Sequence, residues 1–344
     1  MIASRGVEIK AGAPVASAPE LLATGYDAVL AASGAWRAQK MGIEGDASPL
    51  VMDGLAFLQE VNAGARPAIG KKLIVVGGGN TAIDAARAAV RLGAKVRLVY
   101  RRGRAEMPAS AEEVAEAEEE GVAIEFMAAP VRIAKGKVVC LRMAAGPPDA
   151  SGRPRPVPVE GSEFTLSCDA LIVAVGQSAD AGALKLEMNP GGTARVDATL
   201  ATPLRGIFAA GDAVLGPKTI IDAIAQGRLA AVSIDRYLGG EGRIDAGAPA
   251  EAGTELPETM PPGTRRPRPE RVPLKGRLKG FGVVEAGYDE EKAAREAERC
   301  LACDIRQYTV EVNAAICKDC GYCRELCHMD IFAVSDTFNA GGYK

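Results

Sequence analysis

Four cysteines late in the sequence follow one another at a spacing that can hold a metal cluster. Cys317, Cys320, Cys323 and Cys327 run C-x2-C-x2-C-x3-C. Thiolates at this spacing can wrap an iron–sulfur cube, and soft sulfur ligands favour iron–sulfur over a hard cation. A structural zinc site more often shows two separated ligand pairs. We predict a 4Fe-4S cluster and single-electron chemistry, with a zinc knuckle or reduced cysteines as alternatives.

Two further features accompany this run. His328, the only histidine of the chain, follows the last cysteine where bacterial ferredoxins usually carry proline. We favour a surface role for it over tuning of the cluster. Cys300 and Cys303 form a shorter pair. Since two thiolates cannot close a cube alone, this pair either ligates a second cluster with outside help or holds no metal, and both hypotheses stay open.

The composition limits the class of protein. The chain has 344 residues, 48% of them hydrophobic, and a net charge of -3, which gives no reason to expect nucleic acid. It opens with no apolar run of signal-peptide length, and no window approaches the roughly 20 apolar residues of a membrane span. The eight cysteines therefore indicate metal ligands or reduced thiols. We expect a cytoplasmic protein without membrane insertion.

A nucleotide-binding unit is predicted in the first half. A β-branched run at 73–76 leads into the glycine-rich segment 77–82, then a helical stretch at 83–92 and a second strand at 95–100. This order of strand, glycine turn, helix and strand is typical of dinucleotide binding. An ordinary glycine-rich turn between strand and helix is the alternative.

Each residue of the glycine segment has an expected role. Gly77 allows the tight turn, Gly79 lets the backbone approach a pyrophosphate, and Ala82 permits close packing of helix on strand. Asn80 and Thr81 lie between the glycines and the helical stretch and are further predicted cofactor contacts; the amide donors and positive dipole end of the helix N-terminus suit an anion.

The end of the second strand should select the nicotinamide cofactor. An acidic residue there binds the ribose 2′-hydroxyl, whereas arginine accommodates a 2′-phosphate. The residues are Arg101 and Arg102, and guanidinium groups suit phosphate. We predict NADP(H) rather than NAD(H). In the alternative, these arginines are solvated and paired with the acidic run at 112–120, itself the exposed face of a helix.

Two later patterns indicate a flavin. The strand-like segments 171–177 and 206–212 both end near glycine, and a helix is expected to begin near Thr219. A carboxylate after a strand-end glycine can accept hydrogen bonds from ribityl hydroxyls, and a helix N-terminus can stabilise a reduced flavin ring. The predicted cofactor contacts are Gly176, Gly211, Asp212, Thr219 and Ile220. Each pattern alone is also compatible with a plain strand and turn.

Together these motifs resemble a known family. The segments 77–84, 99–102, 107–108, 206–212 and 221–228 look like the FAD/NADPH oxidoreductases related to the small subunit of glutamate synthase and to dihydropyrimidine dehydrogenase. The resemblance covers roughly residues 7 to 240. It implies an NADP domain inserted into an FAD domain, so that 27–34 belongs with 195–240. Ser33 and Gly34 match the Thr-Gly that the family places at the flavin.

One departure from the family is visible. An N-terminal G-x-G-x-x-G should cradle the FAD pyrophosphate, yet none precedes residues 6–9, which look like a strand from the middle of that domain. The chain is a fragment, a truncated product, or completed by another polypeptide. FAD affinity without that element should be poor.

The C-terminal part differs in character. Residues 239–280 are rich in Gly, Pro and Arg, which favours a solvated linker over a docking site for an acidic partner. A helix is expected around 290–298. Residues 317–344 resemble the ferredoxin-like subunit of 2-oxoacid:ferredoxin oxidoreductases, which implies that Cys327 either ligates a second cluster or completes a single one.

We therefore expect an α/β fold with two Rossmann-like domains, the FAD domain incomplete, and a ferredoxin-like segment. The expected boundaries are 1–66 and 181–240 for FAD, 67–180 for NADP, 241–288 for a linker and 289–344 for iron–sulfur. The expected function is electron transfer between NADPH, FAD and a 4Fe-4S cluster, within a hetero-oligomer containing ferredoxin or 2-oxoacid oxidoreductase-type subunits. The alternative is a non-catalytic electron-transfer or assembly subunit. Hydride transfer needs orientation rather than a general base, so no catalytic side chain is predicted. Cys140 and Cys168 are isolated core or surface residues.

Overall fold

The computed structural model describes residues 3–149, 152–243 and 267–297. Most of these, including 269–287, form one compact unit, whereas 267–268 and 288–297 belong to a second. The second unit contains helix α8 (Glu290–Ala297), which confirms the helix expected there. The cysteines from Cys300 to Cys327 lie outside the described residues. No helix in the described ranges is long and apolar enough to cross a membrane.

A five-stranded parallel sheet is the centre of the larger unit. Its strand order is β3-β11-β4-β5-β6. The strands are β3 (Val51–Asp53), β4 (Lys72–Val76), β5 (Lys95–Tyr100), β6 (Ala123–Phe126) and β11 (Ala170–Val173). The helices that connect them are α2 (Gly54–Asn62), α3 (Asn80–Arg91) and α4 (Ala111–Glu119), preceded by the short η2 (Arg104–Glu106). The predicted strand, glycine turn, helix and strand are all confirmed.

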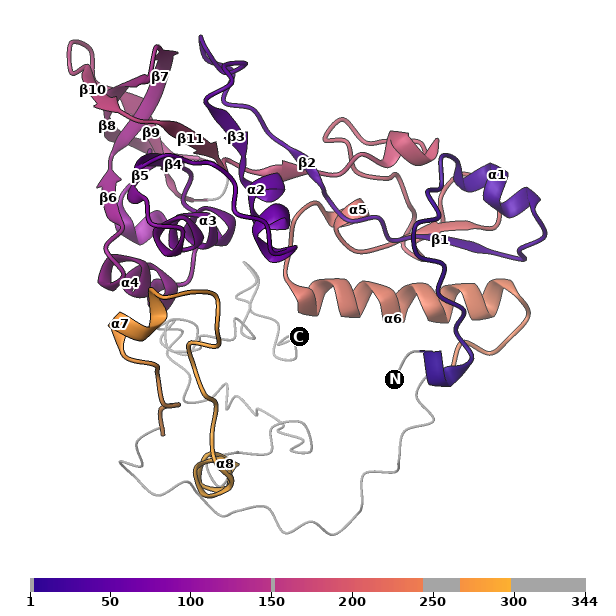
Figure 1. Ribbon diagram of the computed structural model, residues 1–344. Coiled ribbons are helices and arrows are strands. Elements are labelled where there is room, and N and C mark those ends of the chain that lie inside the picture. Colours follow the sequence, from indigo (N-terminus) through magenta and orange to yellow (C-terminus); the bar gives the residue numbers. More distant parts are fainter. Residues whose placement is uncertain (1–2, 150–151, 244–266, 298–344) are drawn as a thin grey trace, which may run out of the picture. The chain divides into compact units, whose positions relative to one another are not determined.

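Both faces of this sheet are buried. Along β4, Leu73 and Val75 pack against the helices, whereas Ile74 and Val76 pack against a second, antiparallel sheet. This alternation follows from the two-residue period of a strand. Figure 1 shows the helices on one side and the antiparallel strands on the other. Those strands are β7 (Ala128–Ala134), β8 (Lys137–Pro148), β9 (Pro154–Pro158) and β10 (Phe164–Ser167).

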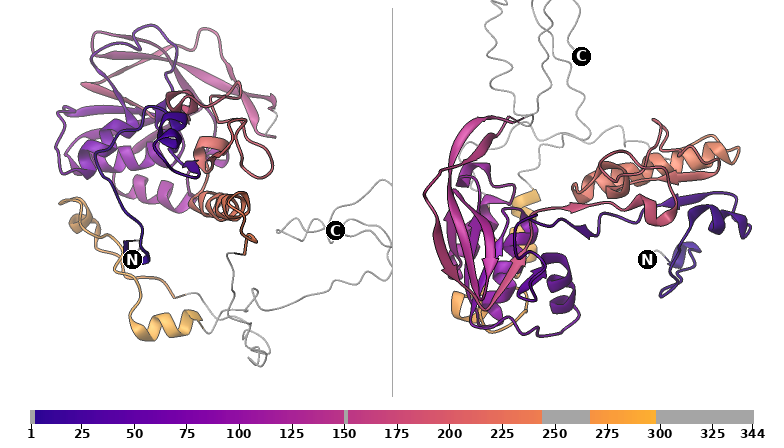
Figure 2. Two further views of the ribbon diagram at one scale, coloured as in Figure 1. Left: turned by 90° about the vertical axis from the view of Figure 1, so that its right-hand side faces the viewer. Right: turned by 90° about the horizontal axis from the view of Figure 1, so that it is seen from above.

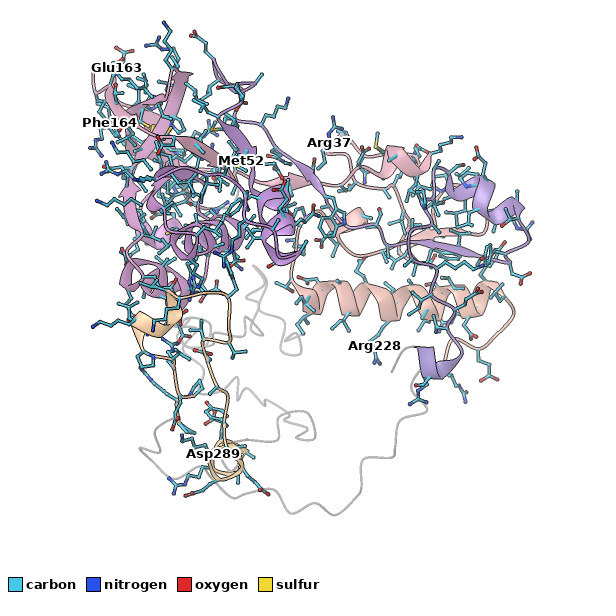
Figure 3. All side chains as sticks on the ribbon, viewed as in Figure 1. Arg37, Met52, Glu163, Phe164, Arg228 and Asp289 are labelled. Atoms are coloured by element: carbon cyan, nitrogen blue, oxygen red, sulfur yellow. The ribbon has the colours of Figure 1, made fainter. Side chains whose placement is uncertain are left out.

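The antiparallel sheet settles the role of two cysteines. Cys140 and Cys168 are both buried in the core between the sheets. Burial raises the pKa of the Cys140 thiol to about 12, so it stays protonated and unreactive. In the same sheet, Phe164, the first residue of β10 and labelled in Figure 3, has its ring centroid 4.2 Å from the guanidinium carbon of Arg142. The cysteines are core residues, as one of the two predicted alternatives stated.

The second half of this unit is a smaller α/β layer. Strands β1 (Val29–Ala31) and β13 (Ile207–Ala209) pair in parallel, and α6 (Ile220–Tyr237) lies along them in Figures 1 and 2. This pairing brings 27–34 beside 195–240, as the family resemblance implies. The remaining elements are η1 (Ala3–Arg5), α1 (Ala18–Ala23), η3 (Ala181–Leu184) and α5 (Asp212–Leu215). The strands β2 (Arg37–Ala38) and β12 (Gln177–Ser178) pair with each other at the crossings between the halves.

The strand expected at residues 6–9 is not formed. That segment has no regular structure, and Val7 and Ile9 are 49% and 67% exposed. A strand is stabilised by hydrogen bonds and side-chain contacts with a neighbouring strand. Among the described residues, no strand lies beside this segment, so the prediction was wrong for this chain.

Residues 269–287, here called the strap, fold back onto α4. The strap contains α7 (Leu274–Arg277) inside the segment expected to be a linker. The guanidinium of Arg271 pairs with three carboxylates, those of Glu112, Glu116 and Glu285. Arg277 adds a contact of 3.2 Å to Glu119. The strap is therefore held on the acidic helix by ion pairs.

The acidic run on α4 is only partly a solvated face. Glu116 and Glu120 are buried, 7% and 3% exposed. Two arginines of α3 reach them: Arg87 lies 2.7 Å from Glu116 and 2.8 Å from Glu120, and Arg91 lies 2.8 Å from Glu120. The expectation of a fully exposed acidic face was wrong, because these two carboxylates join α3 to α4.

Candidate functional site

The carboxyl ends of β4, β5 and β11 open into a cavity of about 530 Å³. Ligands of open α/β sheets bind at this edge. The predicted cofactor residues that border the cavity are Gly77, Gly79, Thr81, Arg101, Arg102 and Gly176. The cavity therefore gathers residues from three separate stretches of the chain.

The glycine turn after β4 has the shape of a phosphate cradle. Gly77 has a φ of 145°, and a Cβ atom there would lie 2.2 Å from the carbonyl oxygen of Ala174. A Cβ on Gly78 would lie 2.3 Å from the Tyr100 ring. At Gly79, by contrast, a Cβ would meet nothing within 4 Å. The first two positions require glycine for the fold, whereas Gly79 leaves space on the cavity side.

The amide groups at the start of the next helix receive no hydrogen bond from an N-cap side chain. Gly79 is the N-cap of α3, and it provides no side-chain acceptor for the first amide groups. A helix N-terminus of this kind binds anions through its amides and its dipole. The residues present thus fit the pyrophosphate of a dinucleotide.

The two arginines after β5 differ in their surroundings. Arg102 is buried; it donates to the Asp149 carboxylate at 2.6 Å and to the carbonyl of Pro154 at 3.1 Å. Arg101 is exposed and borders the cavity. The alternative in which Arg102 pairs with the acidic run was wrong. That run contacts other arginines: Arg87, Arg91, Arg104, Arg271 and Arg277.

Two predicted contact residues do not border the cavity. Asn80 accepts a hydrogen bond from the Ser110 amide at 3.3 Å and so ties the helix start to the loop before α4. Ala82 is fully buried against the sheet, which suits its expected packing role. Thr81 does border the cavity, and its hydroxyl accepts from Gln177 at 3.3 Å.

Lys40, Tyr100 and Arg153 also border the cavity and were not predicted. Tyr100 could have been found as the last residue of the second strand. Lys40 and Arg153 lie in segments without a motif, so no signal in the sequence marked them.

A second hollow, of about 280 Å³, lies in the smaller layer. It gathers the predicted flavin residues Gly34, Gly211, Asp212, Thr219 and Ile220. Gly211 has a φ of 67°, which favours glycine at this turn. Ser33 is exposed and is not among the lining residues. Gly176 borders the first cavity instead.

The polar groups of this hollow are already partly engaged. Asp212 accepts a hydrogen bond from the Lys218 amide at 3.2 Å. At the start of α6, Thr219 and Asp222 form a reciprocal capping box. The hydrogen bond from Thr219 lowers the pKa of Asp222, so its negative charge offsets the positive end of the helix dipole. Part of the expected anion stabilisation is therefore met within the chain.

The described half-domain exposes apolar side chains around this hollow. Ile220, Ile221 and Ile224 are 79%, 73% and 55% exposed on α6. Among the described residues, these side chains lie on the helix that accompanies the two-stranded sheet of β1 and β13.

The fold and these two sites define a pyridine-nucleotide flavoprotein architecture. The pyridine nucleotide-disulphide oxidoreductase family model matches residues 2–227, and the chain belongs to this family. It is 45% identical over 299 residues to the NADP(+)-dependent formate dehydrogenase subunit beta of Moorella thermoacetica, covering 81% of this chain and 42% of that protein.

Two further relatives point the same way. The NADPH-Fe(3+) oxidoreductase subunit beta of Geobacter sulfurreducens is 37% identical over 325 residues, covering 81% of this chain and 48% of the relative. The glutamate synthase [NADPH] small chain of Azospirillum brasilense is 38% identical, covering 64% and 51%. The chain thus spans about half the length of these relatives. The family resemblance inferred from the motifs is confirmed.

Solved structures agree on the fold. Mycobacterium tuberculosis FprA, in complex with NADPH, superposes with a TM-score of 0.55 at 18% identity, covering 66% of this chain and 67% of FprA. The Rossmann-like α/β architecture is therefore confirmed.

Proposed function

We propose that this chain is part of an NADPH-dependent flavin and iron–sulfur oxidoreductase, exchanging electrons with a further protein. The observation that carries the proposal is that the open glycine turn at Gly79 borders the same cavity as the two arginines that follow β5. Bound nicotinamide and flavin would supply hydride transfer and its division into single electrons.

The first cavity would hold NADP(H). The amides at the start of α3 and the open side of Gly79 would bind the pyrophosphate, and the arginine-bearing edge at β5 would receive the 2′-phosphate. Gln177, held on Thr81, would help to shape the wall of the cavity at the end of β11. These groups bind and orient, which is what hydride transfer requires.

The second hollow would hold part of FAD. Gly211 allows close approach of the backbone, and Asp212 and the start of α6 lie beside it. The family binds the FAD pyrophosphate with a G-x-G-x-x-G, so tight FAD binding would need such an element in addition to this hollow.

The cysteine run from Cys317 to Cys327 would hold a 4Fe-4S cluster. The Moorella and Geobacter relatives are named as beta subunits. This supports a hetero-oligomer, with ferredoxin or 2-oxoacid oxidoreductase-type subunits as the expected partners. We also propose a cytoplasmic location, because the eight cysteines suit a reducing compartment.

One observation favours a second candidate function. The flavin half-site has only a two-stranded sheet and an uncovered apolar helix among the described residues. A chain that binds no flavin on its own would serve as an electron-transfer or assembly subunit that carries only the cluster.

Cofactor content tests the proposal. The protein would be purified anaerobically, and its flavin, iron and acid-labile sulfide would be quantified alongside an absorbance spectrum. Stoichiometric flavin with about four irons per chain supports the oxidoreductase. Iron without flavin, even after incubation with FAD, supports the second candidate.

A further inference from the structure

A hairpin of the antiparallel sheet is fastened to the end of β5 by one arginine. β8 ends at Pro148 and β9 begins at Pro154; the described residues between them, Asp149, Gly152 and Arg153, are here called the turn. Arg102 bridges its base, because its guanidinium donates to Asp149 on one limb and to the Pro154 carbonyl on the other. The Arg102 side chain is only 10% exposed. A water-excluded, charge-assisted contact of this kind is stronger than a surface ion pair.

The same carboxylate also shapes the turn. Besides binding Arg102, Asp149 accepts a hydrogen bond from the Arg153 amide at 3.3 Å. The Asp149 amide donates to the Arg153 carbonyl at 2.8 Å, and the Gly152 amide donates to the Asp149 carbonyl at 2.9 Å. The backbone of Arg153 is thus positioned relative to β5 through Asp149 and Arg102.

Arg153 borders the same cavity as Arg101 and Arg102. These three arginines and Lys40 make this wall of the cavity basic, and Asp149 offsets the charge of Arg102. A phosphate monoester carries nearly two negative charges at neutral pH. The Asp53 carboxylate also borders the cavity, but it ends β3, three strands from β5 in the sheet order, or about 14 Å.

We propose that Arg153 is a ligand of the 2′-phosphate of NADP(H), acting together with Arg101, and that Arg102 is a positioning residue that holds Asp149 and, through it, Arg153. This rests on the proposed function, since it concerns the same cavity. It divides the arginine pair predicted from the sequence into one phosphate ligand and one structural clamp. The proposal also adds a third arginine, Arg153, which precedes β9 of the antiparallel sheet.

Binding of two small probes tests the role of Arg153 without any flavin or cluster. Isothermal titration calorimetry would compare adenosine 2′,5′-bisphosphate with 5′-AMP, which lacks the 2′-phosphate, on the full chain. The variant is Arg153→Ala. The matched control is Arg155→Ala, an exposed arginine of β9 that does not border the cavity.

Arg153→Ala should weaken binding of the bisphosphate about tenfold or more and change 5′-AMP binding less than about twofold, because one charge-assisted contact is lost. Arg155→Ala should leave both affinities unchanged. If the wild-type chain prefers the bisphosphate but both variants bind it with the same affinity, Arg153 is not a ligand of the 2′-phosphate. A wild-type chain that does not prefer the bisphosphate overturns the NADP proposal and this inference together.

A double-mutant cycle tests the role of Arg102. If Arg102 acts through the turn, Arg102→Ala weakens bisphosphate binding in the wild-type background and has little effect in the Arg153→Ala background. Equal losses in both backgrounds would make Arg102 a direct ligand and overturn its positioning role. Arg102→Lys, which keeps the charge but not the two-pronged contact, replaces Arg102→Ala if that variant does not fold.

Discussion

The guanidinium of Arg271 lies 2.9 Å from the carboxylate of Glu116, and the same carboxylate lies 2.7 Å from Arg87. Glu116 therefore joins the strap to the core helix α3 through one buried side chain. The carboxylates of Glu112, Glu116 and Glu285 lie close enough together to suggest a cation site. Arg271 pairs with all three, so this cluster is an arginine-binding site within the chain.

Glu116→Gln should lower the free energy of unfolding by about 2 kcal/mol, because two arginines lose a charged acceptor in a buried setting. It should also increase proteolytic cleavage within the strap. Urea unfolding and limited trypsin digestion measure the two effects. Glu118→Gln is the control on the same helix: its surface pair with Arg104 should contribute less than about 0.5 kcal/mol. Equal effects of the two substitutions would show that Glu116 does not hold the strap.

Glu120 should make the free energy of unfolding depend on pH. Burial alone would raise the pKa of Glu120, but the hydrogen bonds from Arg87 and Arg91 outweigh it and lower the pKa below its ordinary value of 4.5. The stabilisation is therefore present above about pH 4.5 and is lost as pH falls through the lower, folded pKa. Glu120→Gln should cost about 3 kcal/mol at pH 7, and this cost should shrink in acid. Unfolding curves at pH 7 and pH 3.5 measure it; a cost independent of pH would contradict the assignment.

Glu113 should give the stability of the protein the opposite pH dependence. Burial raises the pKa of Glu113, and the nearby Asp84 carboxylate raises it further. Among the described residues, one of its carboxylate oxygens is buried without a hydrogen-bond partner. Its contribution favours folding below the ordinary pKa and is lost as pH rises through the raised, folded pKa. Glu113→Gln should therefore raise the thermal midpoint at pH 8 and have little effect at pH 4. A lower midpoint at pH 8 would contradict this.

Substitutions in the glycine turn should separate effects on stability from effects on NADPH binding. Gly79→Ala should leave the thermal midpoint within about 2 °C, since its Cβ meets nothing, but should weaken NADPH binding at least about tenfold through a clash with the pyrophosphate. Gly77→Ala should destabilise the fold by about 2 kcal/mol or more, because its φ is positive and its Cβ would meet the Ala174 carbonyl. Calorimetry and thermal melts check both. Unchanged NADPH affinity in Gly79→Ala would place the pyrophosphate elsewhere.

Local patterns predicted the local parts of this structure. The strand at 95–100 and the helix start after Thr219 lie where the sequence places them, because strand period, glycine turns and capping are short-range properties. The contact between Arg102 and Asp149 and that between Arg271 and Glu116 join distant stretches of chain, and no spacing rule reaches them. The strand predicted at residues 6–9 is absent for a related reason, because a strand also needs a neighbouring strand with which to pair.

The most direct test of the account is anaerobic reduction by the two nicotinamides. Protein that contains flavin and iron would be titrated with NADPH and, separately, with NADH, while absorbance reports flavin and cluster. We predict that NADPH bleaches both bands at concentrations at least about tenfold lower than NADH, because the arginine-bearing edge of the first cavity favours a 2′-phosphate. Equal bleaching by both nicotinamides, or none by NADPH in protein that contains both cofactors, would contradict the account.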